Sequence, residues 1–160
     1  MKFNSANIYD YRRKHGYMEM MLELLIEGER VLIDEIVDKI DIKPVEIVHK
    51  GDVLMVGPKK NIRQIQENNI LIYSTGYIDT IDANIPIEKM LDIWKGEKEK
   101  LKKYVSNPKT SIKLCLTVNL SENPILYFSN EFIEFVSYLN AELEIDSYVE
   151  YDCEENIVLS

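Results

Sequence analysis

Few residues of this sequence have the type and spacing that enzymatic chemistry requires. The two histidines, His15 and His49, stand far apart, and neither is next to Cys115 or Cys153. The sequence has no glycine-rich phosphate loop, no nucleophile elbow and no zinc-binding His-Glu-x-x-His motif. One catalytic hypothesis is left, in which folding brings His49 to a cysteine or a carboxylate. Its alternative is a polar residue at a strand end, and we expect a protein that is not an enzyme, with no catalytic residue.

The sequence also has few residues suited to metal binding or thiol chemistry. Asp79 and Asp82 would need a third ligand to hold a cation, and no calcium-binding loop surrounds them. We expect Asp82 or Asn84 to cap a helix instead. Alternation places Cys115 on the polar side of its strand and Cys153 on the apolar side of another, which predicts no disulfide. We therefore expect no metal and no cofactor.

The strongest pattern is the run ELEIDSYVEYDCEE at residues 142–155, which has seven carboxylates and no basic residue. Because side chains of a strand alternate between its two faces, the acids at even-numbered positions of this run share one face. The predicted partner-binding residues on that face are Glu142, Glu144, Asp146, Tyr148, Glu150 and Asp152. A strand at residues 17–27 adds Glu19, Glu23 and Glu27 if both strands belong to one sheet.

Two interpretations of this acidic surface remain open. Like charges directly opposite on neighbouring strands destabilise a sheet by up to about 1 kcal/mol per pair, so stability does not explain it. Charged faces and edges keep sheets soluble and resist aggregation. Alternatively, the carboxylates attract a basic partner that an exposed Tyr148 helps to hold.

Composition narrows the class of protein. The 160 residues fit a single domain, 1–160, with a polar lead-in at 1–16 and a core at 17–152. A formal net charge of −9 disfavours nucleic acid as the partner, since phosphate binding depends on Lys and Arg. We find no signal peptide and no apolar run long enough to span a bilayer, so we expect no membrane association and a cytoplasmic location.

Periodicity predicts the elements that position these residues. Period-two segments at 17–27, 70–74, 111–120 and 142–152, and a shorter one after Pro44, predict strands, and helical spacing predicts helices at 30–40, 85–104 and 130–140. Residues 53–69 are ambiguous: VLMV suits a strand, and KKNIRQIQENN suits a loop or one helical turn. The order β-α-β-β-α-β-α-β predicts an α+β fold of ferredoxin-like βαβ repeats, with a mainly antiparallel sheet and helices on one face.

Three stretches carry a family resemblance: IDEIVDKIDIKPVEIVHKGD, ILIYSTGY and FIEFVSYLNAELEIDSYV. They resemble the uncharacterised bacterial domain-of-unknown-function family forty-two seventy-nine over about residues 17–150. The shared features are an Ile-x-Pro turn after a helix, a strand closing on Lys-Gly-Asp, and a helix followed by an acidic strand. At residue 73 this chain has Tyr where such proteins have Trp. The resemblance implies a fold and no catalytic residue.

These observations lead to one functional expectation and one alternative. We expect a protein-binding module, acting as a monomer or a homodimer, whose partner is a basic protein. Small acidic proteins of this kind resemble immunity proteins that neutralise bacterial toxins, so a basic toxin is a partner of the expected chemistry. The alternative is a sensor domain for a small ligand or peptide, which predicts an apolar cleft lined by Tyr73 and Tyr77.

Overall fold

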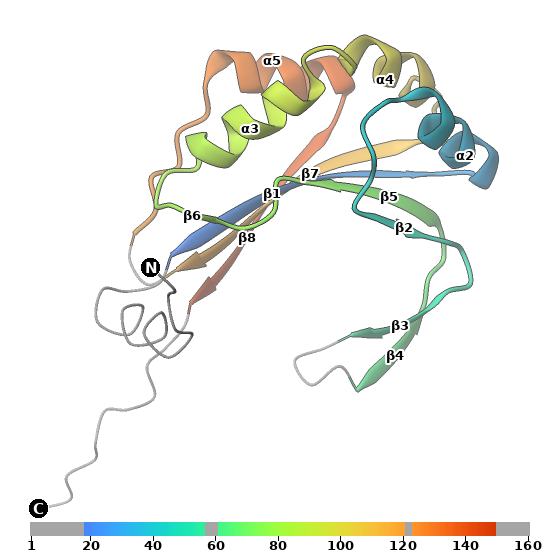
Figure 1. Ribbon diagram of the computed structural model, residues 1–160. Coiled ribbons are helices and arrows are strands. Elements are labelled where there is room, and N and C mark those ends of the chain that lie inside the picture. The colour runs from blue at the N-terminus through green and yellow to red at the C-terminus, as the bar shows by residue number, and fades with distance from the viewer. Residues whose placement is uncertain (1–17, 57–60, 121–122, 150–160) are drawn as a thin grey trace, which may run out of the picture.

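A single main sheet with helices on one side organises the chain (Figure 1). The computed structural model describes residues 18–56, 61–120 and 123–149. The strands are β1 (Glu19–Gly28), β2 (Glu46–Val48), β3 (Val53–Val56), β4 (Ile62–Ile65), β5 (Asn69–Ser74), β6 (Ile78–Asp79), β7 (Ser111–Leu120) and β8 (Glu142–Val149). The helices are α2 (Arg30–Lys39), α3 (Asn84–Trp94), α4 (Lys98–Val105) and α5 (Asn130–Leu139). The predicted α+β class is confirmed.

The order of the strands gives the topology. The main sheet runs β2-β5-β1-β7-β8, and the short β6 pairs with the start of β1. β1 is antiparallel to both β5 and β7, whereas β7 and β8 are parallel. Helix α2 connects β1 to β2 past β5, and α3 with α4 connects β5 to β7 past β1. These two interleaved βαβ units form the predicted ferredoxin-like core, and α5 with β8 adds a third unit at one edge.

The core lies between the helices and the inner face of the sheet. The even-numbered residues of β1 from Met20 to Ile26 are fully buried, which confirms the period-two prediction. Burying each such side chain contributes roughly 1.5–3 kcal/mol. Trp94 of α3 packs edge-on against Tyr73 of β5, with ring centroids 4.9 Å apart. This aromatic pair joins the helix layer to the middle of the sheet.

The prediction of one continuous helix at 85–104 is wrong. Helix α3 ends at Trp94 and α4 begins at Lys98. Between them the N–H of Glu97 donates to the carbonyl of Trp94 in a tighter turn, and Gly96 supplies a residue with low helix propensity. Trp94 at the end of α3 and Leu101 in α4 are both fully buried in the core. In the described parts of the chain, no helix has the length and apolar character that crossing a membrane requires.

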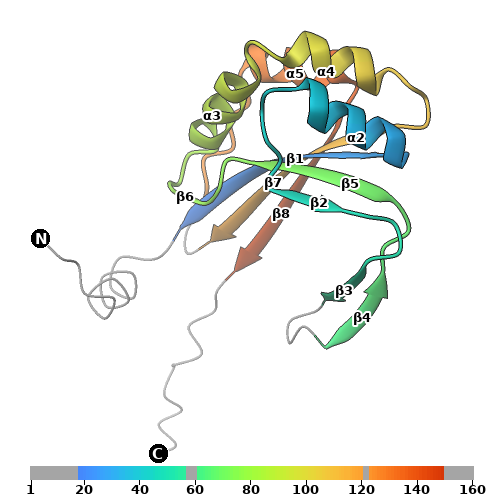
Figure 2. The same ribbon diagram turned by 45° about the vertical axis from the view of Figure 1, so that its right-hand side comes forward.

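The segment that the sequence left ambiguous contains two paired strands, which we call the β3–β4 hairpin. VLMV is strand β3, as predicted, but the expected loop or helical turn contains strand β4, which pairs antiparallel with β3 from Val53–Ile65 to Val56–Ile62. This two-stranded sheet extends away from the main sheet (Figure 2). Its side chains include four large apolar residues that are exposed: Val53, Met55, Ile62 and Ile65. Cross-strand pairing, which local periodicity does not reveal, fixes this segment as strand.

A bulge separates β5 from β6 along one side of β1. Gly76 has a φ of 70°, a left-handed conformation that glycine adopts without steric conflict. Thr75, just before it, exchanges hydrogen bonds with Leu22: each backbone N–H donates, one to the Thr75 hydroxyl and the other to the Leu22 carbonyl. The bulge therefore keeps β1 paired while it brings Tyr77 to the outer face of the sheet.

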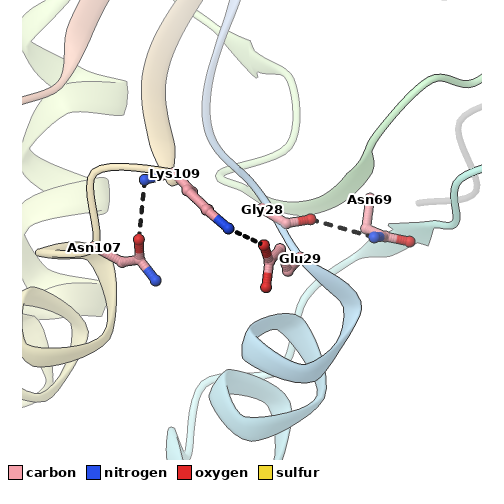
Figure 3. Close-up of polar contacts among 5 residues, drawn as sticks. All are labelled: Gly28, Glu29, Asn69, Asn107 and Lys109. Atoms are coloured by element: carbon pink, nitrogen blue, oxygen red, sulfur yellow. Dashed lines mark hydrogen bonds and ion pairs between the residues drawn. The ribbon is translucent and has the colours of Figure 1, made fainter.

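Polar contacts fix the corner where β1 passes into α2 (Figure 3). The side-chain amide of Asn69 donates to the carbonyl of Gly28 at 3.2 Å, and the ammonium of Lys109 lies 3.0 Å from the Glu29 carboxylate. The side chain of Asn107 accepts a hydrogen bond from the backbone N–H of Lys109 and so orients the loop between α4 and β7. Two segments far apart in sequence thereby hold the ends of β5 and β7 against β1.

Candidate protein-binding face

One face of the main sheet turns away from the helices (Figures 1 and 2), and the strand register places the acidic side chains on it. The register through β7 places the odd-numbered residues of β1 and the even-numbered residues of β8 on this side. We call the following residues the acidic face: Glu19, Glu23, Glu27, Glu142, Glu144, Asp146 and Tyr148. Glu150 and Asp152, which were predicted to belong to it, lie outside the described residues.

Strand β7 separates the two acidic rows. Its outward side chains Lys113, Cys115, Thr117 and Asn119 lie between the acids of β1 and those of β8. The acids of β1 and β8 therefore share a face of the sheet, as expected, without lying directly opposite one another. In the registered strand pairs of the described residues, two acids are direct partners at Glu19–Asp79, between β1 and β6. The acidic face is consequently less destabilising than its composition suggests.

Lys113 supplies a cation within this surface. Its ammonium lies 2.6 Å from the carboxylate of Glu144, one strand away. The hydrogen bond to Lys113 lowers the pKa of Glu144, and the same contact raises the pKa of Lys113. Both groups remain charged over a wide pH range. A lysine side chain on a neighbouring strand is thus accommodated beside the β8 carboxylates.

Cys115 lies in the middle of the face without the features of a nucleophile. Burial, followed by the charge of Asp146, raises the pKa of its thiol to about 11. The Cys115 Sγ lies 3.7 Å from a carboxylate oxygen of Asp146. Cys115, Glu144 and Asp146 present potential metal-ligating atoms within 4.8 Å of one another. Glu144 is already bound to Lys113, and we assign no metal to this group.

Two tyrosines stand at one end of the acidic face. Tyr148 on β8 is 58% exposed and Tyr77, just before β6, is 50% exposed. Asn119, the register partner of Tyr148, donates to the carboxylate of Glu19 at 2.9 Å. Burial raises the pKa of Tyr77, a hydrogen bond with Asn119 lowers it, and Glu19 and Tyr148 are among the charges that act on it. Aromatic rings and carboxylates therefore occupy one continuous end of the face.

Glu23 shows that the face is partly shielded from water. Burial raises its pKa, and the charge of Glu46 on β2 raises it further. Between them, Leu25 and Ile72 are registered neighbours on the same side of the sheet and are half-buried. The acids of β1 thus border an apolar strip, a combination typical of protein-binding surfaces.

A protein-family model matches residues 18–150 of this chain. Its description is domain of unknown function, DUF4279. The chain belongs to the DUF4279 family. The resemblance noted in the sequence is thus confirmed, whereas the likeness to immunity proteins has no support in this match. Comparison with curated proteins and comparison with solved structures each returned no match.

In this DUF4279 chain His49 does not meet Cys115, one of the groups that the catalytic hypothesis considered for it. His49 follows β2 at one edge of the sheet, whereas Cys115 is on β7, with β5 and β1 between them. Three strand spacings of about 4.8 Å exceed the reach of a hydrogen bond. The Asp52 carboxylate accepts a hydrogen bond from the backbone N–H of His49, in the turn that follows β2.

The cleft predicted for the sensor alternative is likewise not formed by the described residues. Tyr73 points to the helix side and is 2% exposed, and burial raises the pKa of its phenol to about 12. Tyr77 lies on the acidic side. The two rings are therefore on opposite sides of the sheet.

The starts of helices α3 and α5 can be compared with the caps expected from the sequence. The N-cap of α3 is Ala83, so the expectation that Asp82 or Asn84 caps this helix is wrong, although the Asp82 carboxylate accepts the N–H of Asn84 at the start of the helix. Ser129 caps α5 by accepting the N–H of Phe132. Tyr77 and Asn119 were not predicted as members of the site. Their polar side chains were the feature of the sequence that could have indicated a place in the site. The pairing of distant strands is what brings them beside Tyr148.

Proposed function

We propose that this DUF4279 chain is a non-enzymatic protein-binding module that binds a basic protein through its acidic face. The observation that supports the proposal most is the gathering of six carboxylates on the side of the sheet opposite the helices. Exposed Tyr148 and Tyr77 at one end supply the aromatic contacts that often dominate interface energies.

Charge explains why the partner is expected to be basic. The formal net charge of −9 attracts cationic proteins at long range, and clustered carboxylates give that attraction a direction. Lys113 beside Glu144 shows that the surface accommodates an ammonium group at short range. A basic toxin such as a nuclease has this chemistry, and a cytoplasmic immunity protein is the specific role that we propose.

The experiment compares two charge-reversal variants in pull-downs from the native lysate. The acidic-face variant is Glu142→Lys, Glu144→Lys and Asp146→Lys. The control is Glu35→Lys, Asp92→Lys and Glu134→Lys, which makes the same charge change at exposed positions of α2, α3 and α5.

We expect the wild-type chain and the control to capture a basic protein that the acidic-face variant loses. Association with the wild type should slow as salt rises, because screening weakens the attraction between charged surfaces. If the captured protein is a nuclease, adding the wild-type chain should inhibit it. Equal capture by the acidic-face variant would show that the face serves solubility alone.

A further inference from the structure

Strand β8 lies at one end of the strand order in the main sheet. Within the described residues, β8 has one strand partner, β7 (Figure 2). It stays regular for eight residues, Glu142–Val149. An edge strand of this length presents backbone N–H and C=O groups that can pair with a strand from another molecule.

The helix-side residues of β8 are incompletely covered. Leu143 and Ile145 are 40% and 41% exposed, although their register partners Leu114 and Leu116 on β7 are fully buried. One further strand beside β8 would cover these two side chains, just as β7 is covered by its neighbours. The edge therefore combines backbone N–H and C=O groups that can pair with another strand and an apolar row on one face.

The acidic row on the other face decides which strand fits. If β8 paired antiparallel with β8 of a second copy about a two-fold axis, even-numbered residues would lie opposite even-numbered residues. In the register centred on Glu144, for example, Glu142 would face Asp146 and Glu144 would face Glu144 of the other copy, which is destabilising. The charge pattern thus selects against self-pairing and in favour of a strand that carries cations on this face.

Strand β7 shows what such a strand looks like. It presents Ile112, Leu114 and Leu116 to the helices and Lys113 to the acidic face, where Lys113 binds Glu144. A strand on the opposite side of β8 would meet the same two faces. Alternating apolar and basic residues would cover Leu143 and Ile145 on one face and neutralise Glu142 and Asp146 on the other.

We propose that β8 binds its partner by strand addition, and that the partner contributes a β-strand in which Lys or Arg alternates with apolar residues. This inference rests on the proposed function and specifies how the acidic face is used. Backbone pairing supplies affinity in this mode, and the alternating side chains supply specificity.

The test uses the full chain and two synthetic peptides. The first is a ten-residue peptide in which lysine alternates with valine, and the second contains five lysines followed by five valines. Both have the same composition and charge. Affinity is measured by calorimetry, and hydrogen exchange of the β8 amides is followed by NMR. The protein variants are Glu144→Gln with Asp146→Asn, and Asp92→Asn with Glu134→Gln as the control in the helix layer.

We expect the alternating peptide to bind at least tenfold more tightly than the block peptide. Its binding should slow exchange at alternate amides of β8, those that point away from β7, and should weaken in the β8 variant but not in the control. If the peptide binds through Glu144 and Asp146 without protecting these amides, the acidic face is a binding site but strand addition is wrong.

Two other outcomes overturn the inference. If binding ignores the β8 variant, the carboxylates of β8 are not involved and strand addition at this edge is wrong, whereas the proposed function is decided separately by the pull-down. If the amides of β8 become protected as the concentration of the chain alone rises, a second copy occupies the edge.

Discussion

Lys113 on β7 and Glu144 on β8 form an ion pair in which the ammonium nitrogen lies 2.6 Å from a carboxylate oxygen. The pair joins two parallel strands across the face that we propose as the binding surface. It also places a cation among carboxylates that would otherwise repel one another. The contact therefore acts on stability and on partner binding in opposite directions.

The variant Lys113→Gln should be slightly less stable at pH 7, because it lacks the ion pair with Glu144. It should also associate faster with a basic partner. The folded-state pKa of Glu144 is lowered from 4.5, so the contribution of the pair is present above that pH and is lost as the pH falls through the lowered value. Because the pKa of Lys113 is raised in the folded state, the pair contributes fully up to pH 10.5. The contribution is lost as the pH rises through the raised pKa. Urea unfolding from pH 2 to 7 measures the first of these changes.

The matched control is Lys43→Gln, which removes the same charge from an exposed position before β2. At pH 7 it should leave stability nearly unchanged, whereas Lys113→Gln causes a small loss that disappears in acid. Basic peptides should associate faster with Lys113→Gln, because the acidic face then lacks its internal cation. Identical pH profiles for the two variants would refute the role of the pair.

Cys115 should be unreactive at neutral pH. Its pKa of about 11, against an ordinary value of 9, reduces the thiolate fraction at pH 7 about 100-fold, and the thiolate is the nucleophile. In a Cys153→Ser background, iodoacetamide should label folded Cys115 far more slowly than the denatured chain. Asp146→Asn should accelerate labelling, since it removes the second cause of the shift. Labelling at the denatured rate would contradict the buried environment.

Two glycines should respond oppositely to substitution by alanine. Gly96 has no atom within 4 Å of an added Cβ and lacks a left-handed φ, so Gly96→Ala should stabilise the protein by about 0.4–1 kcal/mol. Gly76 also has space for a Cβ, but its φ of 70° makes Gly76→Ala destabilising by about 1–2 kcal/mol. Denaturant unfolding of both variants measures the difference, and equal effects would contradict the backbone argument.

Alternation predicted β1 and β7 because one face of each strand is buried and the other is not, and it predicted β8 from the sequence pattern alone, since Leu143 and Ile145 stay partly exposed. In β1 the alternation extends over ten residues with four fully buried side chains, and it correctly assigned Glu23 to the outer face. The family resemblance and the α+β class followed from the same elements in sequence order. Local patterns suffice where the core faces one side of an element.

Relationships between distant strands escaped prediction. No local pattern shows that β7 lies between β1 and β8, yet this order decides whether the acids oppose one another. The contact of Tyr77 with Asn119 depends on the bulge at Gly76 and on the pairing of β1 with both neighbours. Similarly, Ile62–Ile65 becomes a strand through pairing with β3, and its polar sequence obscured that.

The β3–β4 hairpin should be the least stable part of the described chain. It is a separate two-stranded sheet, a size that is marginally stable in water, whereas β1 has strands on both sides. Amides of β3 and β4 should exchange at least about 100-fold faster than those of β1 in native-state hydrogen exchange. Ile65→Thr should change the free energy of unfolding by less than about 0.5 kcal/mol.

The matched core substitution is Leu24→Ala in β1, which should lower the free energy of unfolding by about 2–5 kcal/mol because that side chain is fully buried. The contrast follows from exposure, since Ile65 already contacts water and loses little by becoming polar. Hairpin amides protected as strongly as those of β1 would contradict this argument. Such protection would mean that another surface covers Val53, Met55, Ile62 and Ile65 in solution.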